Sequence, residues 1–512
     1  MSGSRLNRAA RHVSKALAYG LVGALVVLVA VGVFVLNSRP DLHAWHEAEL
    51  NAEFSRGSDV DSFPGYLELE ERVFAELDRE VYDVVGGDDA RSINRYHRGS
   101  LADPQRWPVN WNRSFEWTAD AAPFGALLLH GLSDSPYSLR SVGEALHGAG
   151  GWVVGLRLPG HGTAPSGLLK VKWEDWSAAV RLAMSHLAEQ VPGRPLYIIG
   201  YSNGGALATQ YALSALEDPQ LPMPAGLVLL SPEIGISRLA ALAAWQERLG
   251  HLIGLEKLSW NVLLPEYDPW KYGSFALNAA KQAYRVTLAV QRHIDRLEAS
   301  GDLDRMPRII AFQSVVDATV TAPALVDHLL GRLPPRAADP GDPAPRPHEL
   351  VLFDLNRYSP VVTLMSDDPS AWIEPLKADT GLPFRITLLT NDDVAGREVA
   401  ALSRSPGEAA VERCELGLRW PDNVFSLSHV ALAFPPDDPI YGRERPRDAG
   451  WIFLGDLDLR GENGVLSVPP AAQLRLRWNP FHDYMMNRIL SATLAPGANP
   501  SDCPPAERRP AG

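Results

Sequence analysis

Residues 195–216 read PLYIIGYSNGGALATQYALSAL, and this stretch decides the fold. Its first part, PLYIIG, is a short apolar run typical of a buried strand, and its last part, GALATQYALSAL, is typical of a helix. Between them Gly200 to Gly204 fits G-x-S-x-G, a sharp strand-to-helix turn in which glycines leave room on either side of the serine. The turn places Ser202 at a helix N-terminus, where backbone amides and the helix dipole favour developing negative charge. Ser202 is therefore the predicted nucleophile.

Four further runs repeat this strand-then-helix pattern. Each is short, rich in aliphatic residues, closed by Gly or Pro and followed by a helical stretch. They are GALLLHGL (125–132), GWVVGLRLPG (151–160), AGLVLLSPEIG (225–235) and PRIIAFQSVVD (307–317). Such alternation predicts βαβ units and a mostly parallel sheet, and runs that are apolar on both faces predict helices on both sides of it.

A candidate oxyanion hole lies at the end of the run GALLL, where the chain reads His130-Gly131-Leu132. A flexible turn at Gly131 would aim the Leu132 amide at the point that the Asn203 amide also faces, and two such N–H groups stabilise an oxyanion. An ordinary strand-end turn has the same composition. His130 either braces this loop or takes part in catalysis.

A serine nucleophile needs a base, and the base needs an acid to orient it. In folds of this kind the acid and then the histidine follow the serine, on loops at the carboxyl edge of the sheet. Asp317 ends the run RIIAFQSVV and His429 lies in FSLSHVAL, so these two are the predicted acid and base. The rivals, which lack this combination of setting and spacing, are Asp354, Asp392 and Asp393 for the acid and His328 and His482 for the base.

Together these segments resemble the α/β-hydrolase superfamily, and within it the bacterial carboxylesterases and monoacylglycerol lipases. In that group a strand ends His-Gly-x, a later loop reads Pro-Gly-His-Gly, and the serine elbow, Asp-x-x-Val and a His-Val segment follow in this order. The matching segments are residues 130–132, 159–162, 200–204, 317–320 and 428–430, and Trp173-Glu174-Asp175-Trp176 resembles the group's helix before the elbow. The resemblance covers residues 122–330 and 420–435. It implies an α/β-hydrolase fold, although the gap between Asp317 and His429 is longer than that group's usual spacing.

Composition excludes several classes of protein. The 512 residues are 46% hydrophobic and 21% charged, as in ordinary globular proteins, so neither wholesale disorder nor a polytopic membrane bundle is expected. Lys and Arg number 48 against 61 Asp and Glu, and the net charge of −13 would repel nucleic acid. Cys414 and Cys503 are too few for a thiolate zinc site, and either a single bridge or two thiols is compatible with the sequence. No metal or organic cofactor is expected.

The N-terminus contains a predicted transmembrane helix. Residues 16–36 are 21 consecutive uncharged residues, enough for a helix to span about 30 Å of hydrocarbon. A cleaved signal peptide is the alternative, but the run is long for one and no small-x-small site follows it. The flank before it carries Arg5, Arg8, Arg11 and Lys15, and cationic flanks stay cytoplasmic. The remainder is therefore expected outside the cytoplasm, which is the periplasm if the cell is Gram-negative.

The expected organisation divides the chain into nine parts. A helical cap rich in Leu and Trp, without a strand-like run, is expected over the site and would roof it with Trp245, Leu249, Leu252, Trp260, Leu263 and Trp270. The boundaries are a basic segment (1–15), the transmembrane helix (16–36), a helical connecting region (37–121), the first part of the core (122–233), the cap (234–302), the acid strand (303–333), a Pro-rich linker with a second insertion (334–425), the His loop with a C-terminal helix (426–495) and a disordered tail (496–512).

The predicted function is that of a membrane-anchored serine hydrolase acting on small amphiphilic esters such as monoacylglycerols or lysophospholipids. Ser202 attacks the acyl carbon, His429 moves the proton, Asp317 orients the imidazole, and the Leu132 and Asn203 amides bind the oxyanion. The alternatives are a thioesterase, amidase or acyltransferase on the same residues, or a hydrolase-like module that binds at the membrane without catalysis.

Overall fold

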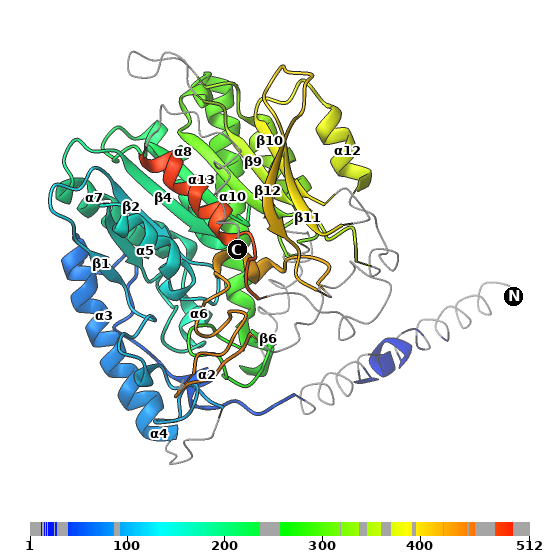
Figure 1. The fold of residues 1–512 in the computed structure, drawn as a ribbon. Coiled ribbons are helices and arrows are strands. Elements are labelled where there is room, and N and C mark those ends of the chain that lie inside the picture. Colours follow the sequence, from blue (N-terminus) through cyan, green and yellow to red (C-terminus); the bar gives the residue numbers. More distant parts are fainter. Residues whose placement is uncertain are drawn as a thin grey trace, which may run out of the picture.

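The computed structural model describes residues 39–85, 93–235, 256–317, 319–336, 346–359, 370–391, 396–422, 424–447, 450–455 and 477–494, with scattered positions between His12 and Val27. A single large sheet runs through the molecule, with helices on both of its faces (Figure 1). The predicted Pro-rich linker lies partly, and the C-terminal tail wholly, outside the described residues.

The sheet has ten strands in the order β1-β3-β2-β4-β5-β8-β9-β10-β11-β12. The strands from β3 to β10 in this order are parallel. The antiparallel pairings are β1 with β3 at one edge, and β10 with β11 and β11 with β12 at the other. This confirms the predicted mostly parallel sheet. The bounds are β1 Phe115–Trp117, β2 Gly125–Leu129, β3 Trp152–Leu156, β4 Leu196–Tyr201, β5 Gly226–Leu230, β8 Arg308–Ser314, β9 Glu349–Phe353, β10 Arg385–Thr390, β11 Glu398–Arg404 and β12 Glu412–Arg419.

Two hydrophobic cores lie on opposite faces of the sheet. Along β4, Ile198 packs into one core with helices α7 and α8, and Ile199 packs into the other with α5 and α13. Because neighbouring strand residues point to opposite faces, a strand covered on both sides is apolar at every position. The helices are α5 Arg140–Gly148, α7 Trp173–Gln190, α8 Asn203–Glu217, α10 Leu277–Ser300, α11 Ala322–His328, α12 Ser370–Ala378 and α13 His482–Leu494.

The region 234–302 differs from the expected all-helical cap. It contains two short strands, β6 (Trp260–Val262) and β7 (Phe275–Ala276), which pair with each other. The expectation that no strand occurs here is wrong, because strands of three and two residues are too short to show an alternating pattern and depend on tertiary contacts. Helix α10 packs along α8 as an outer layer. The central part, 236–255, with Trp245, Leu249 and Leu252, lies outside the described residues.

The region 334–425 extends the central sheet. The run HELVLFDL contains β9, which pairs with β8, and FRITLLTN contains β10, which pairs with β9. Strands β11 and β12 then add an antiparallel edge. The chain returns to the centre afterwards, where the Asn356 amide donates to the Phe425 carbonyl at 2.6 Å and the Ser314 hydroxyl donates to the Leu427 carbonyl at 3.1 Å. The long gap between Asp317 and His429 therefore contains four strands of the central sheet.

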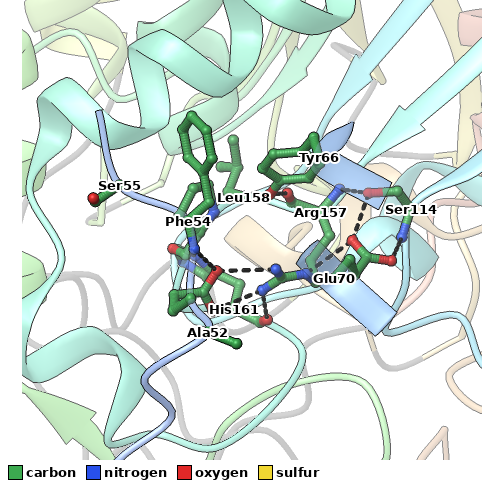
Figure 2. A network of polar contacts seen from close by, with 12 residues as sticks. Ala52, Phe54, Ser55, Tyr66, Glu70, Ser114, Arg157, Leu158 and His161 are labelled. Carbon is green, nitrogen blue, oxygen red and sulfur yellow. Dashed lines mark hydrogen bonds and ion pairs between the residues drawn. The ribbon is translucent and has the colours of Figure 1, made fainter. Parts of the chain in front are cut away.

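The segment before the sheet is bound to the body through a buried arginine. It forms α2 (Ala44–Glu47), α3 (Phe63–Leu77), a π-helical turn (Asp78–Tyr82) and α4 (Asp83–Val85). The Arg157 guanidinium lies between two carboxylates of this segment, with Nε 2.9 Å from Glu70 Oε2 and Nη2 2.9 Å from Glu53 Oε1. Figure 2 shows the network around Arg157 and Glu70. Ser114 donates to Glu70, and the Tyr66 hydroxyl donates to the Arg157 carbonyl.

Burial makes this network a strong constraint on position. Arg157 is 1% exposed and Glu70 3% exposed. A buried charge is tolerated only when its partners are complete, and removing one of them typically costs about 3–5 kcal/mol. The network therefore fixes residues 53–70 against the end of β3.

Two further sequence expectations concern the membrane and the cysteines. Among the positions that the structure describes, no helix combines the length and the apolar character needed to cross a bilayer. Most of the predicted span 16–36 lies outside those positions. Cys414, on β12, is disulfide-bonded.

Candidate active site

Ser202 lies in a strained turn between β4 and α8. Its φ of 53° and ψ of −118° are unusual for a residue with a side chain. The turn is held because the Ser202 amide donates to the Leu230 carbonyl at 2.9 Å and the Ser202 carbonyl accepts from Gly205. A Cβ on Gly200 would lie 2.4 Å from the Gly204 carbonyl oxygen, and one on Gly204 would lie 2.0 Å from the Leu129 carbonyl oxygen. Both glycines are therefore required, for the reason that the sequence motif suggests.

The structure brings together the three residues predicted to react. The Oγ of Ser202 lies 3.1 Å from His429 Nε2, and His429 Nδ1 lies 2.8 Å from Asp317 Oδ2. A carboxylate only accepts, so Nδ1 carries the proton and Nε2 is free to accept the serine proton. His429 begins a short 3-10 turn, His429–Ala433, and its ring stacks on Tyr201.

Asp317 is oriented by two backbone amides and one side-chain amide. Its Oδ1 accepts from the amides of Thr319 at 3.0 Å and Val320 at 3.1 Å, and its Oδ2 also accepts from Gln313 Nε2 at 3.0 Å. Gln313 was not singled out from the sequence. The only indication of its role in the sequence was its position on β8, four residues before the predicted acid.

The rival acids and bases take other places. Asp354 pairs with Arg357 at 2.7 Å and accepts from Thr390, so its carboxylate is used in packing. His328 is exposed at the end of α11, and His482 begins α13 with its Nε2 3.3 Å from Ser141 Oγ. Asp392 and Asp393 lie outside the described residues.

The loop 130–132 passes directly against the nucleophile. A Cβ on Gly131 would lie 3.2 Å from Ser202 Cβ, so a side chain there would push the loop away. Asn203 is the first residue of α8, and its amide has no acceptor within the helix. The placement of Leu132 and Asn203 is thus compatible with an oxyanion hole.

His130 braces this loop. Its Nδ1 lies 2.8 Å from the Gly131 carbonyl and must donate, while its Nε2 accepts from the Leu158 amide at 3.0 Å. Burial lowers the pKa of the imidazole well below its usual value. Because both nitrogens serve the backbone of two loops, the bracing role is the one that this geometry supports.

Glu233 is a residue of the site that was not singled out from the sequence. It follows β5, and its amide donates to the Ser202 carbonyl at 3.0 Å. Its Oε2 atom is buried and has no hydrogen-bond partner among the described residues. Burial raises the pKa of this carboxyl to about 7, and electrostatic attraction to the imidazole of His429 when that ring is protonated opposes part of the rise. The sequence could have indicated Glu233 only through its position, as an acidic residue shortly after the strand that lies beside the nucleophile strand.

Residues 125–329 match the model of a family described as serine aminopeptidase, S33. A thermostable monoacylglycerol lipase of Bacillus sp. (strain H-257) is 31% identical over 123 residues, which are 24% of this chain and 46% of that protein. The chain thus spans less than half the length of this relative.

Two lipases are among the solved structures that match part of the chain. A monoacylglycerol lipase from Paleococcus ferrophilus has 18% identity and a TM-score of 0.33, with 47% of this chain and 88% of that chain covered. A soluble variant of monoglyceride lipase from Saccharomyces cerevisiae has 14% identity and a TM-score of 0.35, with 47% and 82% covered. The family match and the lipase relative confirm the predicted α/β-hydrolase superfamily with a resemblance to esterases and monoacylglycerol lipases.

Glu233 makes stability depend on pH in a direction that can be tested. Its pKa rises from an ordinary 4.5 to about 7 on folding, so the folded state binds more protons between these values. The contribution of this carboxyl to the free energy of unfolding is therefore fully present below about pH 4.5 and is lost as the pH rises through 7. In Glu233→Gln the melting temperature should decline by a few °C less between pH 5 and pH 8 than in the unmodified protein, measured by calorimetry.

The matched control is Glu68→Gln, at an exposed position on α3. It should reproduce the pH dependence of the unmodified protein. An equal decline in the Glu233 variant would show that this carboxyl titrates normally.

Proposed function

We propose that the chain is a serine hydrolase that cleaves carboxylic esters through an acyl-enzyme. The observation that carries this proposal is a hydrogen-bonded triad, called the relay below. Ser202 Oγ lies 3.1 Å from His429 Nε2, and His429 Nδ1 lies 2.8 Å from Asp317 Oδ2. The relay lies at a strained elbow beside the amides of Leu132 and Asn203, in a chain whose matched relative is called a monoacylglycerol lipase.

Each residue of the relay has one role in the reaction. Ser202 Oγ attacks the acyl carbon while His429 Nε2 takes its proton, and Asp317 stabilises the imidazolium through Nδ1–H. The amides of Leu132 and Asn203 donate to the tetrahedral oxyanion. His429 then protonates the leaving alcohol, and a water molecule activated by the same imidazole releases the acid. The chemistry proposed for this relay uses no metal or organic cofactor.

Thioester, amide or acyl-transfer chemistry on the same residues is the alternative reaction. The matched family is described as a serine aminopeptidase, which makes amide hydrolysis the variant with a specific observation behind it. A non-catalytic binding module is the alternative class. Two features argue against this class. The three residues are hydrogen-bonded as catalysis requires, and the strained backbone at Ser202 costs about 1–3 kcal/mol of stability, a cost that a module without catalysis would not need.

The proposed substrates are lipid-like esters. Two residues expected to line the pocket have a packing role instead: Trp260 is 1% exposed beside His46, and Trp270 is 1% exposed and stacks on Tyr137. The support for long acyl chains therefore comes from the lipase relative and from the proposed membrane anchor. A bilayer concentrates amphiphilic esters near a tethered enzyme.

We also propose that residues 16–36 anchor the chain in the plasma or inner membrane, with the catalytic part outside the cytoplasm. The uncharged run and its four cationic flanking residues support this. The disulfide of Cys414 fits an oxidising compartment.

The orientation is tested by fusing a reporter after Gly512. Alkaline phosphatase, which is active only in an oxidising compartment, should be active there, and a fluorescent protein that folds only in the cytoplasm should be dark. The opposite pattern would reverse the proposed orientation. A mature N-terminus beyond Leu36 would replace the anchor with a cleaved signal.

Ser202→Ala should abolish both ester turnover and labelling by a fluorophosphonate, and leave the melting temperature nearly unchanged. His429→Ala and Asp317→Asn should each lower kcat/KM by about 10⁴-fold, because removing a base or its orienter has this effect. Ser300→Ala, at the end of α10, is the matched serine control and should behave as the unmodified protein. Persistent labelling of Ser202→Ala would place the nucleophile elsewhere.

A series of p-nitrophenyl esters from acetate to palmitate tests the lipid proposal. Each additional buried methylene stabilises the bound acyl chain by about 0.8 kcal/mol, so kcat/KM should rise from acetate to a medium or long chain. Specificity constants that fall steadily from acetate would exclude lipid-like substrates. Faster cleavage of aminoacyl anilides than of any ester would favour the amidase alternative.

A further inference from the structure

An exposed apolar surface lies at the end of the molecule where the chain enters from residue 39. Val84 is 67% exposed, Leu264 48% and Val262 37%. Val84 and Leu264 line one cavity of about 530 Å³. We call the following residues of this cavity the apolar rim: Pro40, Val84, Val85, Leu263, Leu264 and Pro265. In Figure 1, α2, α4 and β6 lie together at this end.

The start of the described chain is fixed to the same place. Arg39 Nη1 donates to the carbonyl of Lys257 at 2.8 Å and to that of Trp260 at 2.7 Å. Lys257 Nζ in turn lies 2.8 Å from Asp41 Oδ1. Residue 39 is three positions beyond the end of the proposed anchor. Because so short a link spans little distance, the end of the anchor must lie close to the apolar rim.

The charges at this surface do not oppose contact with lipid. Asp41 is the one carboxylate among the described residues that line the cavity, and Lys257 neutralises it. The lining also contains Asn94 and three histidines, His43, His46 and His97, which carry no negative charge. Attraction to a bilayer would therefore come from apolar burial and would depend little on salt or on anionic lipid.

We propose that the apolar rim rests in the headgroup boundary of the bilayer that holds the anchor. This inference relies on the proposed anchor and deepens the proposed function. The occupant is a lipid surface because the uncharged run of 21 residues ends only three positions before Arg39, and a membrane around that run must pass close to Val84 and Leu264. Large exposed aliphatic residues cost free energy in water and gain it in the interface.

The rim is connected to the site by short hydrogen-bonded steps. Leu264 exchanges hydrogen bonds with Ser274, whose Oγ lies 2.9 Å from His46 Nε2. Two residues earlier, the Tyr272 amide donates to the Ser133 carbonyl at 2.8 Å, next to the loop residue Leu132. The segment 263–274 thus links the apolar rim to the loop that carries Leu132.

Spin labels on the full chain in phosphatidylcholine vesicles test the docking. Labels at Leu264→Cys and Val84→Cys should be more accessible to oxygen than to a water-soluble nickel chelate, as expected inside a bilayer interface. Val411→Cys, 53% exposed beside β12, is the matched control and should show the reverse. The Cys414 disulfide leaves that sulfur unlabelled.

Three results would overturn the docking. Nickel accessibility at positions 84 and 264 equal to that at position 411, in protein that floats with the vesicles, would reject it while the anchor stands. Protein that does not float would reject the anchor and the docking together. Spin–spin broadening at position 264 without oxygen access would assign the surface to a second copy of the chain.

An activity measurement separates this proposal from the proposed function. The double variant Val84→Glu and Leu264→Glu should lower kcat/KM for monoacylglycerol in vesicles by about tenfold and leave hydrolysis of soluble p-nitrophenyl butyrate unchanged. Val411→Glu should change neither rate. Equal rates in vesicles for the double variant would overturn the docking. Absence of all turnover in the unmodified protein would instead reject the proposed function, and the spin-label result would be unaffected.

Discussion

The close approach of β4 and α8 at Ser202 is the constraint on which the site depends. The turn is so tight that a methyl group on Gly200 or Gly204 would overlap backbone atoms. It forces Ser202 into a positive φ and lifts its hydroxyl out at the start of α8. The backbone hydrogen bonds from Ser202 to Leu230 and Gly205 keep this geometry in place. Everything else at the site is arranged around a hydroxyl that this turn alone presents.

The positions of the base and the acid follow from the sheet. Asp317 leaves β8, two strands from β4, and its own loop amides orient it. His429 follows four further strands, β9 to β12, which extend the sheet to its far edge before the chain returns. The hydrogen bonds of Ser314 with Leu427 and of Asn356 with Phe425 return that segment to the centre. A relay of two hydrogen bonds is therefore assembled from parts more than a hundred residues apart.

The N-terminal region gives the body a fixed orientation toward its entry point. Arg157 binds Glu53 and Glu70 in the interior, and Arg39 binds backbone carbonyls just before and at the start of β6. Buried and complete ion pairs of the first kind specify position more than they add stability. With both ends of residues 39–70 attached, this region is part of the catalytic body.

The sequence alone determined the parts of this protein that are local. The elbow, the strand-then-helix alternation and the order Ser202, Asp317, His429 depend on neighbouring residues or on chain order, so they were readable without a structure. Tertiary structure decided what depends on distant contacts. The pairing of β9 and β10 with the central sheet, the short strands β6 and β7 and the bracing role of His130 have no local signature. Apolar runs look alike whether they extend a sheet or form an insertion, because their pattern records burial and not the identity of the partner.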